Sequence, residues 1–381
     1  MFKFDNGIGL QRVGKLRIRD RRISTPSMFL GQSIKSPVSP WTDGVPADGV
    51  LLNAYEILSS NKFRNIAEER GIKEIAKHKN VILDSGGFLY LKKSAKQKSK
   101  DAFDIFNGKQ GELRKKIFKI QEKSNAIINV PLDCPPVYSD PYEERKMELT
   151  LKNTRFWFRY GNGIEKMPVI HASLSENNFK TVMKKFKRYK TDYIGLGGLV
   201  PVLMGRTTEN DRISTIDKLV DLRLKFWSKF LHVFGVGGTN TIRLMFLLGV
   251  DSVDSIGWRI RAAHRILLVD GIGERHVIKK ERGWSIKFIS NKEWRLLRDC
   301  ECPVCSSHNL SRLKKLYISS FEHRCIHNAW IQQKEVEIAR DLISSGEYEE
   351  YIKNRLNTGI WRKITNYAFK KLKEESKCKN F

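Results

Sequence analysis

Residues that could do chemistry occur in six short segments of the sequence, each at the end of an apolar or β-branched run. The segments are Asp84-Ser85-Gly86-Gly87-Phe88, Asp133-Cys134, His171, Gly197-Gly198, Gly235-Val236-Gly237 and Asp254. Carboxylates serve as nucleophiles or as general acids and bases, and glycines let backbone N–H groups approach a ligand closely. Brought together, these groups suit chemistry on a polar, planar molecule. Taken singly, each also has a structural explanation as a turn, a core histidine or a site of close packing.

The apolar runs that precede these residues alternate with segments of helical periodicity. Seven runs are predicted to be strands: 50–55, 81–87, 126–133, 168–173, 193–199, 232–238 and 252–256. Helical spacing appears between them, as in 178–189 and 214–230. The alternation predicts an α/β fold, a (β/α)8 TIM barrel with one strand not recognisable from the pattern, and a doubly wound open sheet is the alternative. In such barrels the active site lies at the carboxyl ends of the strands, where the six segments fall.

The charge of the chain indicates a polyanionic partner. Lys and Arg total 70 against 42 Asp and Glu, which gives a net charge of +28 over 381 residues. Basic residues concentrate in four runs: 92–100, 114–119, 184–190 and 353–379. Any one run is explained by a solvated helix face, but four runs of the same sign favour nucleic acid as the partner.

The second chemical motif is Cys300-x-Cys302-x2-Cys305, followed after 21 residues by His327. Three thiolates and one imidazole are typical of a closed, tetrahedral and structural zinc site. His323 and Cys325 are alternative fourth ligands, and reduced buried cysteines without metal are the alternative interpretation. Neither Cys134 nor Cys378 is expected to bind metal.

Cellular location follows from what the sequence does not contain. No apolar stretch is long enough to cross a bilayer, and the N-terminal region carries Asp5 and Gly7 early. We therefore expect a cytoplasmic protein with no membrane partner. In that reducing compartment, metal binding explains the clustered cysteines better than disulfides do.

These motifs, in this order, resemble those of the tRNA-guanine transglycosylase superfamily. The resemblance runs from about Gly14 to about Leu342 and includes the cysteine and histidine spacing. Its parts are the opening hairpin at 14–29, the DSGGF motif at 84–88, the base-recognition segment at 132–135, the GGL turn at 197–199, the glycine turn at 235–237 and the nucleophile segment at 253–255. It implies a barrel over residues 1–297 and a zinc-binding, helical, basic lobe over residues 298–381.

The resemblance also implies an activity and the residues that carry it. The enzyme would be a pentosyltransferase that replaces guanine in a nucleic acid by a free 7-deazaguanine base. Asp254 would be the nucleophile that holds the sugar covalently, and Asp84 the general acid and base. The implied base-binding residues are Asp133, Ser85, Phe88, His171, Gly197, Gly198 and Phe234.

Two departures from the bacterial tRNA enzymes bear on the polynucleotide. His171 stands where those enzymes have a glutamine, and 255–261 replaces their proline-threonine-arginine segment. With the high positive charge and no room for an added tRNA-binding domain beyond the lobe, these departures favour the DNA-acting branch, which inserts preQ0-type bases into DNA. The alternative polynucleotide is tRNA. The host would be a bacterial or phage-infected cell, and a homodimer and an accessory ATPase are further expected partners.

Two alternatives lie outside this activity. A non-catalytic, zinc-dependent nucleic-acid-binding subunit would have no reason to keep both Asp84 and Asp254, which are present here. A barrel acting on a free nucleoside would gain little from so much positive charge. We therefore favour the enzyme acting on nucleic acid.

Overall fold

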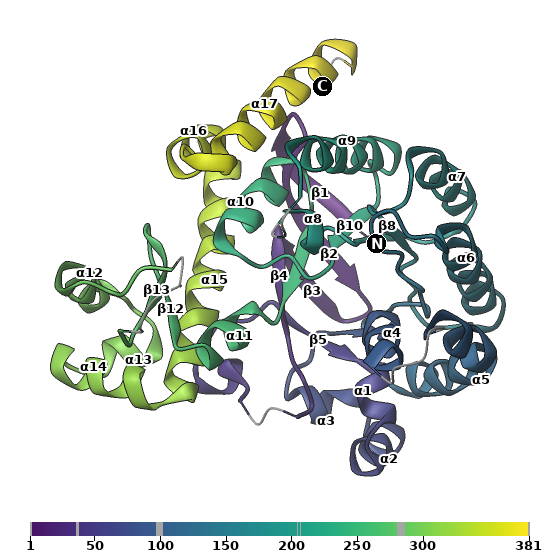
Figure 1. The fold of residues 1–381 in the computed structure, drawn as a ribbon, viewed down its shortest axis with the longest axis horizontal. Coiled ribbons are helices and arrows are strands. Elements are labelled where there is room, and N and C mark those ends of the chain that lie inside the picture. Colours follow the sequence, from purple (N-terminus) through teal and green to yellow (C-terminus); the bar gives the residue numbers. More distant parts are fainter. Residues whose placement is uncertain are drawn as a thin grey trace.

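A parallel eight-stranded sheet forms the centre of the computed structural model, which describes residues 2–35, 38–96, 102–203, 205, 207–279 and 286–379 (Figure 1). In spatial order its strands are β7 (Ile128–Asn129), β6 (Val81–Asp84), β5 (Gly49–Asn53), β4 (Ser27–Gly31), β11 (Ser252–Ser255), β10 (Phe230–Val233), β9 (Tyr193–Gly197) and β8 (Val169–His171). An isolated parallel bridge between Asn129 and Lys166 brings the chain before β8 against β7, so the sheet curls into a barrel. The predicted (β/α)8 architecture is confirmed.

The strand that the sequence pattern did not reveal is β4. All five of its residues are buried, and it lies between β5 and β11, with Asp254 paired in register with Phe29. It follows the antiparallel strands β1 (Phe2–Ile8), β2 (Gln11–Ile18) and β3 (Arg21–Thr25) after a single residue, Pro26. The pentapeptide Ser-Met-Phe-Leu-Gly, buried throughout, has no polar–apolar alternation to set it apart from that preceding hairpin.

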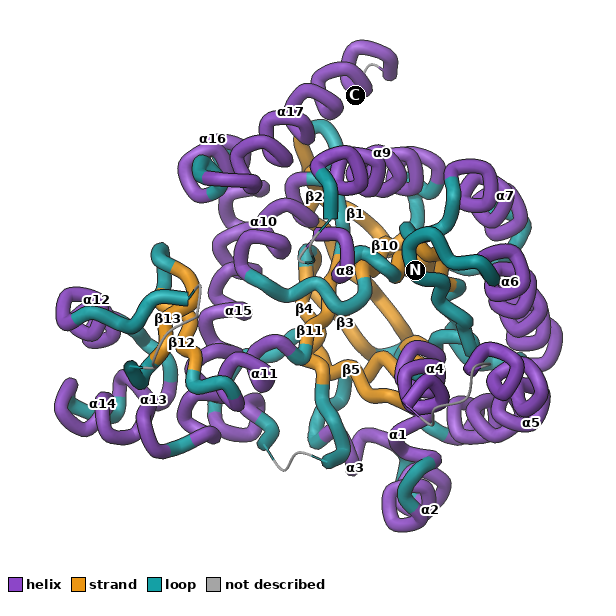
Figure 2. Tube along the Cα trace, viewed as in Figure 1, coloured by secondary structure: helices purple, strands orange, loops and turns teal. Residues whose placement is uncertain are grey.

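Helices surround the strands on the outside of the barrel (Figure 2). They are α1 (Ala54–Leu58), α2 (Asn61–Glu69), α3 (Ile72–Ala76), α4 (Gly87–Lys96), α5 (Ala102–Lys123), α6 (Glu143–Tyr160), α7 (Glu176–Phe186), α8 (Val200–Leu203), α9 (Glu209–Lys225), α10 (Thr239–Leu247) and α11 (Gly257–Ala263), with a 3-10 turn, η1, at Pro40–Asp43. Such helices pack on the strands through an apolar face. In helix α7 the buried residues on that face are Phe179, Val182, Met183 and Phe186. None of the described helices is long and apolar enough to cross a membrane.

A smaller group of elements packs beside the barrel and leads into the C-terminal helices. It contains β12 (Ile266–Val269), β13 (Gly273–His276), α12 (Asn291–Leu296), η2 (Leu297–Asp299), α13 (Pro303–Ser306) and α14 (Leu310–Ser319). Their apolar residues form a separate core that includes Leu267, Trp294, Cys302 and Tyr317.

The long helix α15 (Phe321–Ser345) joins this group to the barrel and to α16 (Tyr348–Arg355) and α17 (Gly359–Lys379) (Figure 1). Its polar side chains bind barrel backbone and side chains along its length. Gln333 Nε2 donates to the Met28 carbonyl at 3.1 Å, and Arg243 forms two hydrogen bonds with the Glu335 carboxylate at 2.8 and 2.5 Å. The helix therefore spans both parts of the protein.

Candidate active site and metal centre

Three aspartates lie at the carboxyl ends of barrel strands, and their charges act on one another. Asp84 ends β6, Asp133 follows β7, and Asp254 lies in β11. Burial raises the pKa of Asp84 to about 8, with further contributions from the negative charges of Asp133 and Asp254. Asp84 is therefore protonated at neutral pH and can donate a proton to a ligand.

Two hydrogen bonds fix one oxygen of the Asp84 side chain. Asn53 Nδ2, from the end of β5, and the backbone N–H of Gly86 both donate to Oδ2 at 3.1 Å. Asn53 also caps α1, because its side chain accepts from the N–H of Glu56. Sequence reasoning did not single out Asn53, although its place at a strand end beside an aspartate of the next strand is the kind of signal that marks the other site residues.

Asp133 lies within reach of two of the predicted base-binding residues. Ser85 Oγ donates to Asp133 Oδ1 at 3.0 Å, and His171 Nε2 lies 3.3 Å from Asp133 Oδ2. That second contact lacks the alignment of a hydrogen bond, and neither ring nitrogen of His171 has a hydrogen-bond partner among the described residues. A buried imidazole with both nitrogens unsatisfied can bind a polar ligand at the mouth of the barrel.

The glycine at 197 makes room for this histidine. A Cβ added to Gly197 would lie 2.9 Å from His171 Nδ1, closer than real Cβ contacts allow. The paired glycines 197 and 198 thus lie beside His171, with Gly198 close to Ser173. Both were predicted base contacts, and the structure brings them to the histidine.

The predicted aromatic walls differ in exposure. Phe88, in the first turn of α4, is 59% exposed and offers an open ring face. Phe234 is partly buried, with its ring edge-on to His232 at a centroid distance of 4.5 Å. Only Phe88 therefore presents a largely free ring to solvent.

The Asp254 carboxylate is held at one of its two oxygens. The backbone N–H of Gly235 donates to Oδ1 at 2.9 Å, and His232 Nε2 lies 3.2 Å from the same oxygen. Gly235 has a φ of +76°, a conformation that favours glycine, so the turn after β10 can direct its N–H at the carboxylate. Sequence reasoning missed His232, which was treated as part of an apolar strand.

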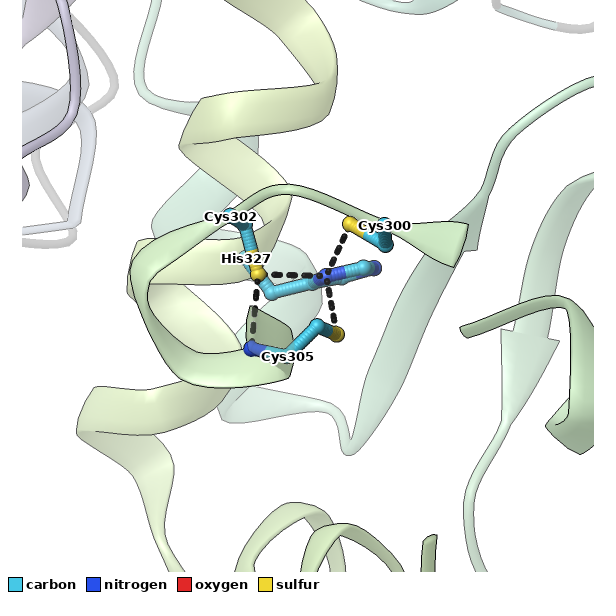
Figure 3. Close-up of side chains that lie close together, drawn as sticks. All are labelled: Cys300, Cys302, Cys305 and His327. Atoms are coloured by element: carbon cyan, nitrogen blue, oxygen red, sulfur yellow. Dashed lines mark hydrogen bonds between the residues drawn. The ribbon is translucent and has the colours of Figure 1, made fainter. Parts of the chain in front are cut away.

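The four predicted metal ligands form one cluster (Figure 3). The ligand atoms of Cys300, Cys302, Cys305 and His327 all lie within 4.8 Å of one another. His327 Nδ1 lies 3.8, 3.4 and 3.6 Å from the three sulfur atoms in that order. Ligands on a tetrahedral zinc ion, with bonds of about 2.3 Å to sulfur and about 2.0 Å to nitrogen, would be about 3.5 Å apart. The spacing of the imidazole nitrogen from the three sulfur atoms therefore fits a shared metal ion.

The surroundings of His327 support this arrangement. His327 Nε2 lies 2.8 Å from the Leu268 carbonyl, so the hydrogen is on Nε2 and the lone pair of Nδ1 faces the thiols. The alternatives lie elsewhere: His323 Nδ1 contacts Ser320 Oγ at 2.6 Å, and Cys325 is buried in the main core. Burial raises the pKa of the Cys134 thiol, and the side chain of Cys378 lies outside the described residues.

The protein is a curled parallel barrel with aspartates at the carboxyl ends of its strands and an appended cysteine-histidine cluster. These features place it in the class of barrel enzymes, and the sequence motifs lie at the strand ends and in the cluster. The family model described as queuine tRNA-ribosyltransferase matches residues 7–359, and the chain belongs to this family.

Archaeal relatives extend the comparison. The tRNA-guanine(15) transglycosylase of Pyrococcus furiosus is 24% identical over 355 residues, covering 90% of this chain and 54% of the relative. That of Pyrococcus abyssi is 24% identical over 380 residues, covering 95% and 58%. That of Methanopyrus kandleri is 24% identical over 369 residues, covering 94% and 72%. The chain thus spans little more than half the length of the Pyrococcus relatives it matches.

Proposed function

We propose that this protein is a guanine base-exchange transglycosylase acting on nucleic acid, a pentosyltransferase. The observation that carries the proposal is the convergence at the barrel mouth of a protonated carboxyl, Asp84, and a carboxylate held at one oxygen, Asp254. Family membership and the name tRNA-guanine(15) transglycosylase of the relatives support it. A non-catalytic binding subunit would not need such a pair.

The exchange takes two substitutions at the same carbon. Asp254 Oδ2 forms a bond to C1′ of the target nucleoside while the C1′–N9 bond breaks and its electron pair leaves with guanine. Asp84 gives its proton to that leaving base. In the second substitution N9 of the incoming base attacks C1′, Asp254 leaves with the electron pair of the C1′–Oδ2 bond, and Asp84 takes a proton back. Two inversions retain the configuration, and water takes no part.

The groups around Asp133 are proposed to bind the purine. Asp133 would accept hydrogen bonds from N1–H and the exocyclic amino group. Ser85 Oγ donates to Asp133 Oδ1 and fixes the carboxylate. The N–H groups near Gly197 and Gly198 would contact O6, and the unsatisfied imidazole of His171 lies beside them. Phe88 would stack on the ring, and Phe234 would form a second, less exposed wall.

The polynucleotide is proposed to be tRNA, because the relatives are named tRNA-guanine(15) transglycosylases. The net charge of +28 suits DNA equally well, since basic residues contact phosphates that both polymers share. Insertion of a preQ0-type base into DNA therefore remains a prediction of the sequence. So do the homodimer, the accessory ATPase and the boundary near residue 298.

The metal is proposed to be Zn²⁺, bound by Cys300, Cys302, Cys305 and His327. A closed shell of protein ligands leaves no position for a substrate, so its role is structural. Bound zinc would tie the short segment around α13 to the start of α15. Because α15 also packs on the barrel, the site would hold the smaller group of elements in place.

The decisive experiment measures exchange and its covalent intermediate on both polymers. Purified protein is incubated with radiolabelled guanine and either unmodified tRNA or guanine-containing DNA, and labelled nucleic acid is digested to nucleosides and identified by mass spectrometry. A labelled ribonucleoside supports the proposal, and a labelled deoxynucleoside supports the DNA alternative. Asp254→Ala should abolish incorporation and adduct formation, whereas Asp341→Asn, at an exposed position of α15, should change neither.

Incorporation that persists in Asp254→Ala would refute the assignment of the nucleophile. No incorporation by the wild-type protein into either polymer would refute the proposed activity.

A further inference from the structure

A buried histidine links the predicted nucleophile to a serine in the interior of the barrel. His232 is on β10, level with Ser252 on β11 in the parallel register, and both residues are fully buried. Ser252 and Asp254 are two residues apart on the same strand, so their side chains point to the same face. The imidazole of the neighbouring strand spans the gap between them.

The distances define a chain of three side chains. Ser252 Oγ lies 2.6 Å from His232 Nδ1, and His232 Nε2 lies 3.2 Å from Asp254 Oδ1. A carboxylate oxygen can only accept, so the hydrogen must be on Nε2. The Ser252 hydroxyl can serve Nδ1 either as donor or as acceptor, which allows the ring to keep that orientation.

Two aromatic rings pack against the imidazole. Phe29 of β4 lies edge-on to His232 at a centroid distance of 6.0 Å, and Phe234 does so at 4.5 Å. With these neighbours and no exposed surface, the ring has little freedom to turn away from Asp254. A histidine packed this way acts at a fixed angle on a single oxygen.

We infer that His232, oriented by Ser252, is a positioning residue that makes Asp254 a good leaving group in the second half of the exchange. The inference rests on the proposed function. With the Gly235 N–H it directs two donors at Oδ1, so Oδ2 is the oxygen that bonds to C1′.

The reason lies in the charge on Oδ1. In the covalent intermediate Oδ1 is a neutral ester carbonyl, a weaker acceptor than a carboxylate oxygen. As the C1′–Oδ2 bond breaks, negative charge returns to the carboxyl group and the His232 hydrogen bond strengthens. In the first half, the free carboxylate already has this bond at full strength before reaction, so the bond gives no advantage to the transition state that forms the adduct.

The two halves are therefore expected to respond differently when the donor is removed. In His232→Phe the release of the sugar to an incoming base should slow about 10- to 100-fold, the range for one hydrogen bond to a charged group. Formation of the adduct should change by less than about threefold, because its ground and transition states lose the same bond. The covalent adduct should accumulate in this variant.

The test is a single-turnover measurement with end-labelled tRNA and, in parallel, end-labelled DNA. Adduct formation is followed by the appearance of a labelled protein band that resists denaturation. Breakdown is followed by the loss of this band after addition of excess free guanine. His232→Gln keeps an amide N–H donor and should restore much of the breakdown rate. Ser252→Ala leaves the Nε2 donor in place and should slow breakdown less than His232→Phe does. His276→Phe removes another buried histidine, on β13, and should leave both rates unchanged.

The outcomes separate this inference from the activity on which it rests. Equal slowing of formation and breakdown in His232→Phe, or no slowing of either, would show a structural role only and overturn the inference. If His232→Phe does not fold, the other two variants decide. The inference is supported if His232→Gln or Ser252→Ala slows breakdown more than formation, and it is overturned if breakdown and formation change equally in each of these variants. Absence of any adduct in the wild-type protein with both polymers would overturn the proposed function and the inference together.

Discussion

Replacing Asp84 by asparagine should stabilise the protein while removing its activity. Asn53 and Gly86 donate hydrogen bonds to Asp84 Oδ2, and an asparagine carbonyl oxygen placed there accepts both. The substitution removes only the ionisable group. What it relieves is the cost of keeping a carboxyl protonated in the folded protein, which burial and the negative charges of Asp133 and Asp254 impose.

The size of the effect follows from the raised pKa. A shift from 3.8 to about 8 means that the folded protein holds a proton that the unfolded chain releases. Wild-type stability therefore falls as the pH rises from about 4, and the loss is complete above about 8. At pH 7 the penalty is at most about 4 kcal/mol, from about 1.4 kcal/mol for each pH unit between the ordinary pKa of 3.8 and pH 7. Asp84→Asn should gain that amount at pH 7, slightly more at pH 8.5 and almost nothing at pH 4.

Urea unfolding followed by tryptophan fluorescence at pH 5 and pH 8.5 measures this difference. Asp341→Asn, which removes the same charge from an exposed position of α15, is the matched control and should give similar stability changes at the two pH values. An Asp84→Asn variant no more stable than the wild type at pH 8.5 would refute the reasoning. So would a gain of equal size at both pH values, because it would not come from ionisation.

Two further predictions concern the metal and the base. Chelation, or Cys302→Ser, should release about one zinc per chain by atomic absorption and lower the melting temperature, because the ligands that join α13 to α15 are lost; an unchanged melting curve after complete metal loss would contradict a structural role. Phe88→Ala should raise the KM for guanine about 5- to 150-fold, the range for one base–aromatic stack, and leave the melting temperature unchanged since the ring is 59% exposed; an unaltered KM would exclude Phe88 from base binding.

The strand order and the strand-end residues were predictable because their signals are local. Apolar runs ending in Asp84, His171 or Asp254 are visible in the sequence, and the barrel rule places their ends at one mouth. The strand β4 gave no such signal, because it is wholly buried without polar–apolar alternation and follows a hairpin after one residue. The residues around the aspartates were harder to predict, since Asn53 and His232 matter only through neighbours on adjacent strands.

The metal cluster shows the same limit on a smaller scale. Cysteine spacing identified three ligands, but His323, Cys325 and His327 all remained candidates for the fourth. The choice depends on the Leu268 carbonyl, which orients the His327 ring from a strand of the β12–β13 hairpin. No spacing within the sequence contains that information, because it arises from packing between α15 and the hairpin.

Helix α15 also sets an order in which the protein can be completed during synthesis. The first barrel strand, β4, meets its neighbour β11 only after most of the chain has been made, as the pairing of Ser27 with Ser252 shows. Gln333 of α15 then donates to the Met28 carbonyl on β4, and Gln332 donates to the Gly237 carbonyl. Such distant partners make folding slow and leave the early half exposed while the ribosome is still working. A nascent chain stalled before α15 would lack the helix whose glutamines bind β4 and the turn after β10, so the contact between the first and last barrel strands would be incomplete.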